Sequence, residues 1–556
     1  MTAPDEFDAI VVGAGINGMT AAALLAREGW SVALLDSADE IGGFIGSAEL
    51  IRPGYVHDIW SSWHPLFVSG PAYAKLGPDL HRHGLAYANT DGPLTASVAD
   101  DGSVTMAWRD PAATAAQFAD QADGAAYLAA LNRFGAHVEA IGGLLGSELR
   151  GSALLRHTLG LARPGGTTEL EAYARDVATS GRAWCRREFR GHEVDHLWTP
   201  WLLHAGLAPD NASGGLMIPV FAASMHAAGT PVVVGGAARF VGAFRALLDE
   251  LGVSVRTGAR VHAIDVAGGH ATGVRAATAD GEVRLRASRA VLASVTPAAL
   301  YLDLLPAASV PAAARRDALG YRPGRAAAQL HMALSGPVPW NDERLAAVPL
   351  LHLSDGSAST AISCAEAEAG LLPRRPTVVV GQQHVLDPSR APEGAATLWI
   401  QLQELPRRLA GDAAGEIDTS DGWSPAAVEA LADRVIARIE RHAPGLRSRI
   451  LGRHLIGPTD LAARNANAVD GDPYGGASEL DQNLMWRPGP ATARHRTVVP
   501  GLWHIGASTH PGPGLGGGSG HLVAEQLTRP SRSTSVLDGA RRVLTRHRGP
   551  GATTSR

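Results

Sequence analysis

The chain has 556 residues, of which 45% are hydrophobic, and a formal net charge of −5. This length exceeds what one hydrophobic core supports, so we expect two domains. The composition is that of a packed globular protein rather than a disordered one, and the charge gives no reason to expect a nucleic-acid partner. The two cysteines, Cys185 and Cys364, lie far apart. They exclude a CxxC disulfide reductase, a zinc site and a disulfide framework, and with no signal peptide at the N-terminus they favour a cytoplasmic chain.

The first 36 residues have the pattern of a dinucleotide-binding unit. A short apolar run leads into a glycine-rich turn, an alanine-rich stretch without proline follows, and a second apolar run ends in an acid; these are residues 7–12, 13–18, 16–28 and 30–36. The order strand, turn, helix, strand and acid predicts a βαβ unit with its ligand at the helix N-terminus.

Each residue of this turn has an expected task. Gly13 permits the tight turn, Gly15 lets the backbone approach a pyrophosphate, and Gly18 lets helix and strand pack closely. Asp36 falls where an acid bonds the ribose hydroxyls. The cofactor contacts we expect in this unit are Gly13, Gly15, Ile16, Asn17, Gly18, Asp36 and Ser37.

A second glycine pair, Gly42 and Gly43, favours FAD over NAD. FAD enzymes of this kind carry such a pair shortly after the acid, where the loop runs beside the cofactor. Phe44 follows the pair here, where an arginine is common, so one charged contact is missing or supplied elsewhere.

Glycine is concentrated again near the other end of the chain. Residues 501–520 hold eight glycines around His510 and two prolines. We expect this segment to return to the same cofactor and lie beside its reactive ring, with Gly506 and Gly516 in contact and His510 near the isoalloxazine.

Several blocks, in a fixed order, give the chain a family resemblance. They are Gly54-Tyr-Val-His57-Asp58, His64-Pro65-Leu66, Val234-Gly235-Gly236, residues 387–394, Gly471-Asp472-Pro-Tyr-Gly-Gly, Asp481-Gln482, Arg487-Pro488 and Arg496-Thr-Val-Val-Pro-Gly501-Leu. With these blocks the chain resembles the phytoene desaturase-like FAD oxidoreductases, which include carotenoid desaturases, isomerases and ketolases. The resemblance implies FAD as cofactor, contact of the adenine with the backbone near Val261, and catalytic candidates at His57, Asp58 and His510.

The resemblance and the strand pattern together imply an α/β fold. A Rossmann-type, glutathione-reductase-like FAD-binding domain would be interleaved with an α+β substrate domain. We expect the FAD-binding domain in residues 1–75, 230–300 and 480–528, the substrate domain in 76–229 and 301–479, and a basic tail in 529–556.

Lysine is nearly absent, with Lys75 alone. Flavin amine oxidases resemble this fold and commonly place a lysine near flavin N5 through a water. The middle and C-terminal regions offer no lysine for this purpose, so an amine-oxidase mechanism is disfavoured.

Aromatic and uncharged segments suggest where a substrate lies. Trp60 and Trp63, and likewise Trp198 and Trp201, suit a pocket for an extended or polycyclic apolar molecule, or else plain core packing. The uncharged stretch 211–238 contains prolines and too short an apolar run to span a membrane, so we expect a buried helix or a tunnel wall.

The favoured function is dehydrogenation, in which an apolar substrate gives a hydride to flavin N5 and oxygen or a quinone accepts the electrons. Redox-neutral isomerisation or ketolation of a polyene stays open, and so does a flavin-binding protein with little catalysis.

The tail, residues 529–556, holds seven arginines and one acid, with a short apolar face between them. Such a segment is either a basic amphipathic helix that rests on an anionic membrane or a solvated tail. The first alternative would make the protein peripheral to the membrane.

Overall fold

A computed structural model describes residues 5–163 and 165–529 of the chain. The predicted membrane-binding tail lies, apart from Arg529, outside the described residues.

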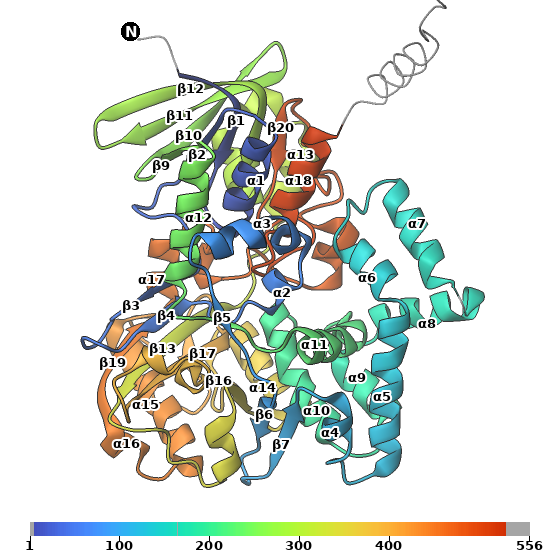
Figure 1. Ribbon diagram of the computed structural model, residues 1–556, viewed down its shortest axis with the longest axis vertical. Coiled ribbons are helices and arrows are strands. Elements are labelled where there is room, and N and C mark those ends of the chain that lie inside the picture. The colour runs from blue at the N-terminus through green and yellow to red at the C-terminus, as the bar shows by residue number, and fades with distance from the viewer. Residues whose placement is uncertain (1–4, 164, 530–556) are drawn as a thin grey trace, which may run out of the picture.

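The first sheet contains the two strands predicted around the glycine-rich turn. Its order is β10-β11-β12-β1-β2-β9, with β20 also paired to β12 (Figure 1). β1 runs parallel to β2 and β12, and β12 runs parallel to β20, whereas β10, β11 and β12 form antiparallel hairpins. The strands are β1 (Asp5–Val12), β2 (Val32–Leu35), β9 (Ser254–Arg256), β10 (Arg260–Ala267), β11 (His270–Thr278), β12 (Gly281–Ala293) and β20 (Leu502–His504).

Four longer helices pack around the first sheet: α1 (Ile16–Arg27), α3 (Pro71–Arg82), α12 (Ala238–Glu250) and α18 (Gly518–Thr528). α1 is buried along most of its length because its side chains are alanine, leucine and methionine. Two shorter elements, α2 (Pro65–Val68) and α13 (Ala312–Gly320), complete this half.

The second sheet lies in the lower half of Figure 1 and has the order β19-β13-β17-β16-β14-β6-β7. One face packs on α15, whose buried residues recur at helical spacing from Ala427 to Ile439. Its strands are β6 (Pro93–Val98), β7 (Val104–Trp108), β13 (Ala326–Leu334), β14 (Leu350–Leu353), β16 (Val378–Gly381), β17 (Ala396–Leu405) and β19 (Ile450–Ile456). The helices of this half are α14 (Ser357–Glu368), α15 (Pro425–His442), α16 (Leu446–Arg449) and α17 (Pro458–Arg464).

A group of helices forms the right-hand side of Figure 1. They are α4 (Pro111–Ala115), α5 (Gln121–Ala136), α6 (Val138–Leu145), α7 (Ser152–Leu161), α8 (Gly166–Ala178), α9 (Gly181–Glu188), α10 (Glu193–Trp198), the 3₁₀ helix η1 (Thr199–Ala205) and α11 (Gly214–Ala228). α11 is the helix expected within the uncharged stretch 211–238. Within residues 5–163 and 165–529, none of the helices has the length and apolar character needed to cross a bilayer.

Three two-stranded ribbons join these parts. They are β3 (Ile45–Ala48) with β4 (His57–Trp60), β5 (Tyr87–Ala88) with β8 (Val232–Val233), and β15 (Leu371–Leu372) with β18 (Gly411–Asp412). The chain passes repeatedly between the two large sheets, because the first takes its strands from both chain ends and from residues 254–293. The architecture confirms the predicted α/β fold class, and the domain boundaries remain a prediction.

Candidate active site

The glycine-rich turn lies where β1 passes into α1. Gly13 has a φ of +94°, and a Cβ on it would meet the carbonyl oxygen of Ser294 at 2.8 Å. A Cβ on Gly18 would meet the carbonyl oxygen of Gly13 at 1.9 Å. Glycine is therefore required at both positions by the protein's own backbone.

Gly15 differs, because a Cβ there would meet no protein atom within 4 Å. It is the N-cap of α1, and no side chain caps this helix, so the N–H groups around Ile16 and Asn17 face no capping oxygen. Gly43 packs on the same turn, because a Cβ added to Gly43 would lie 3.1 Å from the Gly15 Cα. The neighbouring Gly42 N–H donates to the Ala14 carbonyl at 2.9 Å. An uncapped helix N-terminus beside open space suits the pyrophosphate of FAD.

Asp36 lies directly beside this turn. Its Oδ2 accepts the Ala14 N–H at 2.6 Å and its Oδ1 accepts the Ala38 N–H at 2.9 Å. Ser37 is exposed. The Asp36 carbonyl also accepts the Ala259 N–H at 2.8 Å, which brings the start of β10, with Val261 part-buried, against the same loop. These residues fit the ribose and adenine end of the cofactor.

The C-terminal glycine-rich segment meets the N-terminal turn. The Gly506 N–H donates to Ser519 Oγ at 2.8 Å, and Ser519 Oγ donates to Asn17 Oδ1 at 2.9 Å. Gly506 has a φ of +102° and packs on Ser294, while Gly516 packs on the Leu66 carbonyl. The predicted contacts from both chain ends therefore border one region at the carboxyl ends of β1, β12 and β20.

His510 lies in this segment with its side chain buried. Its Nε2–H donates to the Leu144 carbonyl of α6 at 3.0 Å, and its own carbonyl accepts from His495 Nε2 at 2.8 Å. Burial lowers the pKa of His510 to about 4, so the ring is neutral at pH 7. Among the described residues, no hydrogen bond or ring contact joins His510 to His57 or Asp58.

His57 is a buried imidazole on β4. Within residues 5–163 and 165–529, neither of its ring nitrogens has a hydrogen-bond partner. Its ring lies 5.5 Å from that of His331, and burial lowers its pKa to about 4. His57 is therefore neutral at pH 7, with both nitrogens free of protein partners.

Asp58, the next residue, is fully engaged in structural contacts. Oδ1 accepts from Arg390 Nη1 and from the Ala237 N–H, both at 2.8 Å, and Oδ2 accepts from Ser62 Oγ at 2.5 Å. The side chains of Asp58 and Arg390 are both 0% exposed, and Asp387 also binds Arg390. This carboxyl group is one partner of a buried ion pair and anchors segment 57–64 of the chain.

Strand β13 supplies residues that the sequence patterns did not point to. The side-chain amide of Gln329 bonds both the N–H and the carbonyl of Trp60, at 2.8 and 2.5 Å. His331 lies two positions further along on the same face. The signal was available, because Gln329 and His331 are the polar residues of an otherwise apolar strand and are spaced by two.

Aromatic residues also pack beside segment 57–64. Trp63 lies 5.2 Å from Trp399 of β17, edge to face. The indole nitrogens of Trp60, Trp63 and Trp399 are buried without hydrogen-bond partners among the described residues. Trp198 and Trp201 belong to the core under α11, in agreement with the packing alternative for that pair.

Lys75 lies on α3, half exposed, and pairs with Glu525 of α18. It lies at the surface, and among the described residues no hydrogen bond or ion pair joins it to His57 or His510.

Comparison with known proteins places the chain in a family. Residues 16–400 match the model of the "flavin containing amine oxidoreductase" family. Over 94% of both chains, the protein is 26% identical to pyridine nucleotide-disulfide oxidoreductase domain-containing protein 2 of Rattus norvegicus. It is 25% identical to the phytoene desaturase of Fusarium fujikuroi, covering 94% of this chain and 89% of that protein.

Solved structures agree on the fold. An oxidoreductase from Methanosarcina mazei superposes with a TM-score of 0.59 at 16% identity, over 93% of this chain and 99% of the other. Putrescine oxidase bound to putrescine gives a TM-score of 0.57 at 16% identity, over 94% and 99%. The family match spans most of the chain and the glycine turns fit the cofactor, so the chain belongs to the flavin-containing amine oxidoreductase family and is an FAD-dependent oxidoreductase.

Proposed function

We propose that this enzyme dehydrogenates an apolar carbon skeleton, of the isoprenoid or polycyclic kind, rather than an amine. The observation that carries the proposal is the chemistry of segment 57–64 and the strands facing it. Asp58 is the sole carboxylate of that segment, and Arg390 neutralises it at 2.8 Å. A cationic amine would meet no free counter-charge there, whereas an uncharged molecule would meet indole and neutral imidazole rings.

The scarcity of lysine supports the same choice. Lys75 is ion-paired on the surface, so no lysine ammonium is available beside the flavin. The 25% identity to a phytoene desaturase agrees with a polyene or isoprenoid substrate.

The dehydrogenation removes a hydride from one carbon and a proton from its neighbour, and leaves a carbon–carbon double bond. FAD, when bound, accepts the hydride at flavin N5. We assign the proton to His57, whose neutral ring has no hydrogen-bond partner at either nitrogen among the described residues. Oxygen or a quinone then takes the two electrons.

An anaerobic flavin-reduction assay on the holoenzyme tests this function. Isoprenoid alcohols and carotenoid precursors should bleach the flavin absorbance, whereas primary amines and polyamines should leave it unchanged. Bleaching by amines alone would overturn the proposal. Product formation from a polyene only after prior flavin reduction, with no net electron transfer, would identify an isomerase instead.

A variant separates the role of His57 from cofactor binding. His57→Phe should retain FAD but reduce it at least about 100-fold more slowly, since a general base contributes 10²–10⁴-fold. Phe67→Leu, which alters a buried ring among Tyr73, Phe240 and Phe244, is a matched packing control and should reduce FAD at a near-normal rate. Equal rates for His57→Phe and the wild type would remove His57 from the reaction.

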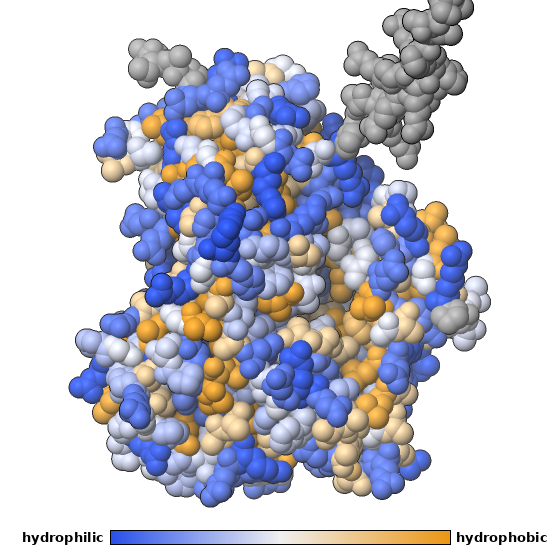
Figure 2. Space-filling view, in the orientation of Figure 1, coloured by the Kyte–Doolittle hydropathy of each residue, from blue (hydrophilic) through white to orange (hydrophobic). Residues whose placement is uncertain are grey.

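Contact with a membrane is a further part of the proposal, because an apolar substrate dissolves there. The tail carries seven arginines. On α7, Leu155 and Leu159 are 64% and 54% exposed, and apolar residues lie over this helix in Figure 2. Exposed leucines on a helix that also carries Arg156 suit the surface of an anionic bilayer.

A further inference from the structure

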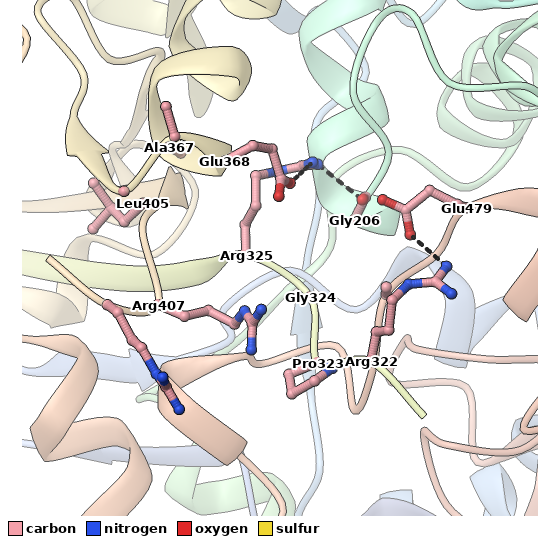
Figure 3. Close-up of a pocket in the computed structure, with 14 residues that line it drawn as sticks. Gly206, Arg322, Pro323, Gly324, Arg325, Ala367, Glu368, Leu405, Arg407 and Glu479 are labelled. Carbon is pink, nitrogen blue, oxygen red and sulfur yellow. Dashed lines mark hydrogen bonds and ion pairs between the residues drawn. The ribbon is translucent and has the colours of Figure 1, made fainter. Parts of the chain in front are cut away.

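A cavity of about 290 Å³ opens beside the start of β13. Five segments form it: the end of η1 at Gly206, the loop 322–325 before β13, the end of α14, the end of β17, and residues 477–479 (Figure 3). Its volume is at the lower end of the range for small-molecule sites.

The lining of this cavity is cationic. Four arginines, Arg322, Arg325, Arg407 and Arg408, line it together with two carboxylates, Glu368 and Glu479. The lining therefore has a formal charge of +2, although the chain as a whole is negative. An apolar substrate would not be drawn to such a wall.

Arg325 forms the buried part of the wall. It is 7% exposed; its Nη1 pairs with Glu368 at 3.2 Å and its Nη2 donates to the Gly206 carbonyl at 2.9 Å (Figure 3). Its Nε is buried and has no hydrogen-bond partner among the described residues. Glu368 is 62% exposed, so the charge on Arg325 is balanced mainly by a carboxylate that reaches toward solvent. Because the carboxylate partner of this buried guanidinium is so exposed, its charge can also attract another anion.

The other arginines lie at the rim and are exposed. Arg322 binds Asp481 at 2.9 Å and lies 3.8 Å from Glu479, and Arg407 lies 3.5 Å from Asp470. Within the part of the chain that the structure describes, Arg408 forms no ion pair. Exposed pairs of this kind are weak, so an oxyanion can compete with Asp470 for Arg407. Arg408 can bind the oxyanion without losing an ion pair among the described residues.

We propose that this cavity is a binding site for a small organic anion that carries phosphate or carboxylate groups. The planar guanidinium forks that line it match the oxygen pairs of either group. The site is separate from the proposed dehydrogenation of an apolar substrate and does not depend on it.

Titration calorimetry on the FAD-loaded full-length protein tests the proposal, with inorganic pyrophosphate and citrate as probes. At least one probe should bind with one site per chain and more weakly as salt rises. Pyrophosphate alone would identify a phosphate site, citrate alone a carboxylate site, and both a general oxyanion site. No binding of either probe would overturn the proposal.

Three variants locate the binding. Arg407→Gln combined with Arg408→Gln should weaken it at least about tenfold, a loss expected from removing charge-assisted contacts. Glu368→Gln should strengthen it, because Arg325 loses its competing carboxylate. Arg286→Gln, an exposed arginine of β12 in the other sheet, should leave it unchanged. Equal weakening by Arg286→Gln, or weakening by Glu368→Gln, would show that the anion binds elsewhere.

Discussion

The side-chain amide of Gln329 holds the backbone of Trp60 from both sides. Its Oε1 accepts the Trp60 N–H at 2.8 Å and its Nε2 donates to the Trp60 carbonyl at 2.5 Å. Trp60 has a φ of +68°, a left-handed conformation that is uncommon for a bulky residue. The clamp fixes the end of β4 in a strained conformation, directly before residues 61–64.

Replacing this amide should be costly. Gln329→Ala leaves the buried N–H and carbonyl of Trp60 unpaired, and we expect a loss of about 3 kcal/mol in the free energy of unfolding. Denaturant titration measures it. Gln401→Ala, at the paired position of β17, is the control and should cost less than about 1 kcal/mol. Equal losses for the two variants would mean that the clamp does not stabilise Trp60.

Asp58 should behave as an anchoring group rather than as a base. Asp58→Asn leaves Arg390 with one carboxylate in a fully buried place, so we expect a loss of about 3 kcal/mol or more in unfolding free energy. Glu250→Gln, which disrupts the exposed pair with Arg82, should cost less than about 1 kcal/mol. A stable Asp58→Asn protein that binds FAD but reduces it slowly would instead assign Asp58 to catalysis.

The glycine turn offers a test that separates cofactor binding from folding. Gly15→Val projects its side chain into space that no protein atom fills, so the chain should fold but copurify with little FAD. Gly18→Ala forces a Cβ onto the Gly13 carbonyl, so it should lower the yield of folded protein. Circular dichroism and the flavin-to-protein ratio distinguish the two effects. A full flavin complement in Gly15→Val would place the pyrophosphate elsewhere.

Acid should destabilise the fold through its buried histidines. Burial lowers the pKa of His57 and of His510 to about 4, from the ordinary value of 6.5. The unfolded chain therefore binds more protons between those values, so this contribution to stability is complete above pH 6.5 and is lost as the pH falls toward 4. Each ring contributes up to about 3 kcal/mol.

Unfolding titrations across this pH range measure the slope. His57→Gln should flatten it, whereas replacing the exposed His270 by Gln should not. A slope that is unchanged in His57→Gln would show that this ring titrates alike in both states.

The basic tail gives a prediction about membranes. Deleting residues 530–556 should abolish binding to vesicles that contain anionic lipid and leave the FAD content unchanged, because the glycine turns lie within the rest of the chain. Cosedimentation with neutral and anionic vesicles measures the binding. Unchanged binding after the deletion would exclude the tail from membrane contact. The exposed leucines of α7 would then be the remaining candidate.

Features that depend on neighbouring residues could be predicted from the amino-acid sequence. The turn between β1 and α1 could be predicted because Gly13 adopts a positive φ and Gly18 packs on the Gly13 carbonyl, both within one βα unit. The buried helix α11 was likewise expected from a local feature, an uncharged stretch whose apolar run is too short to span a membrane. FAD as cofactor and the α/β fold class were expected from such local patterns together with the family resemblance that the ordered sequence blocks carry.

The tertiary structure alone decided which distant side chains meet. Asn17 meets Ser519, Trp60 meets Gln329, and Asp58 meets Arg390. Nothing in the segment around Asp58 indicates that its charge is neutralised from a loop more than 300 residues away. A carboxylate has the same sequence pattern whether it acts as a base or as an anchor, and its role is set by the burial and partners that only the closed fold supplies.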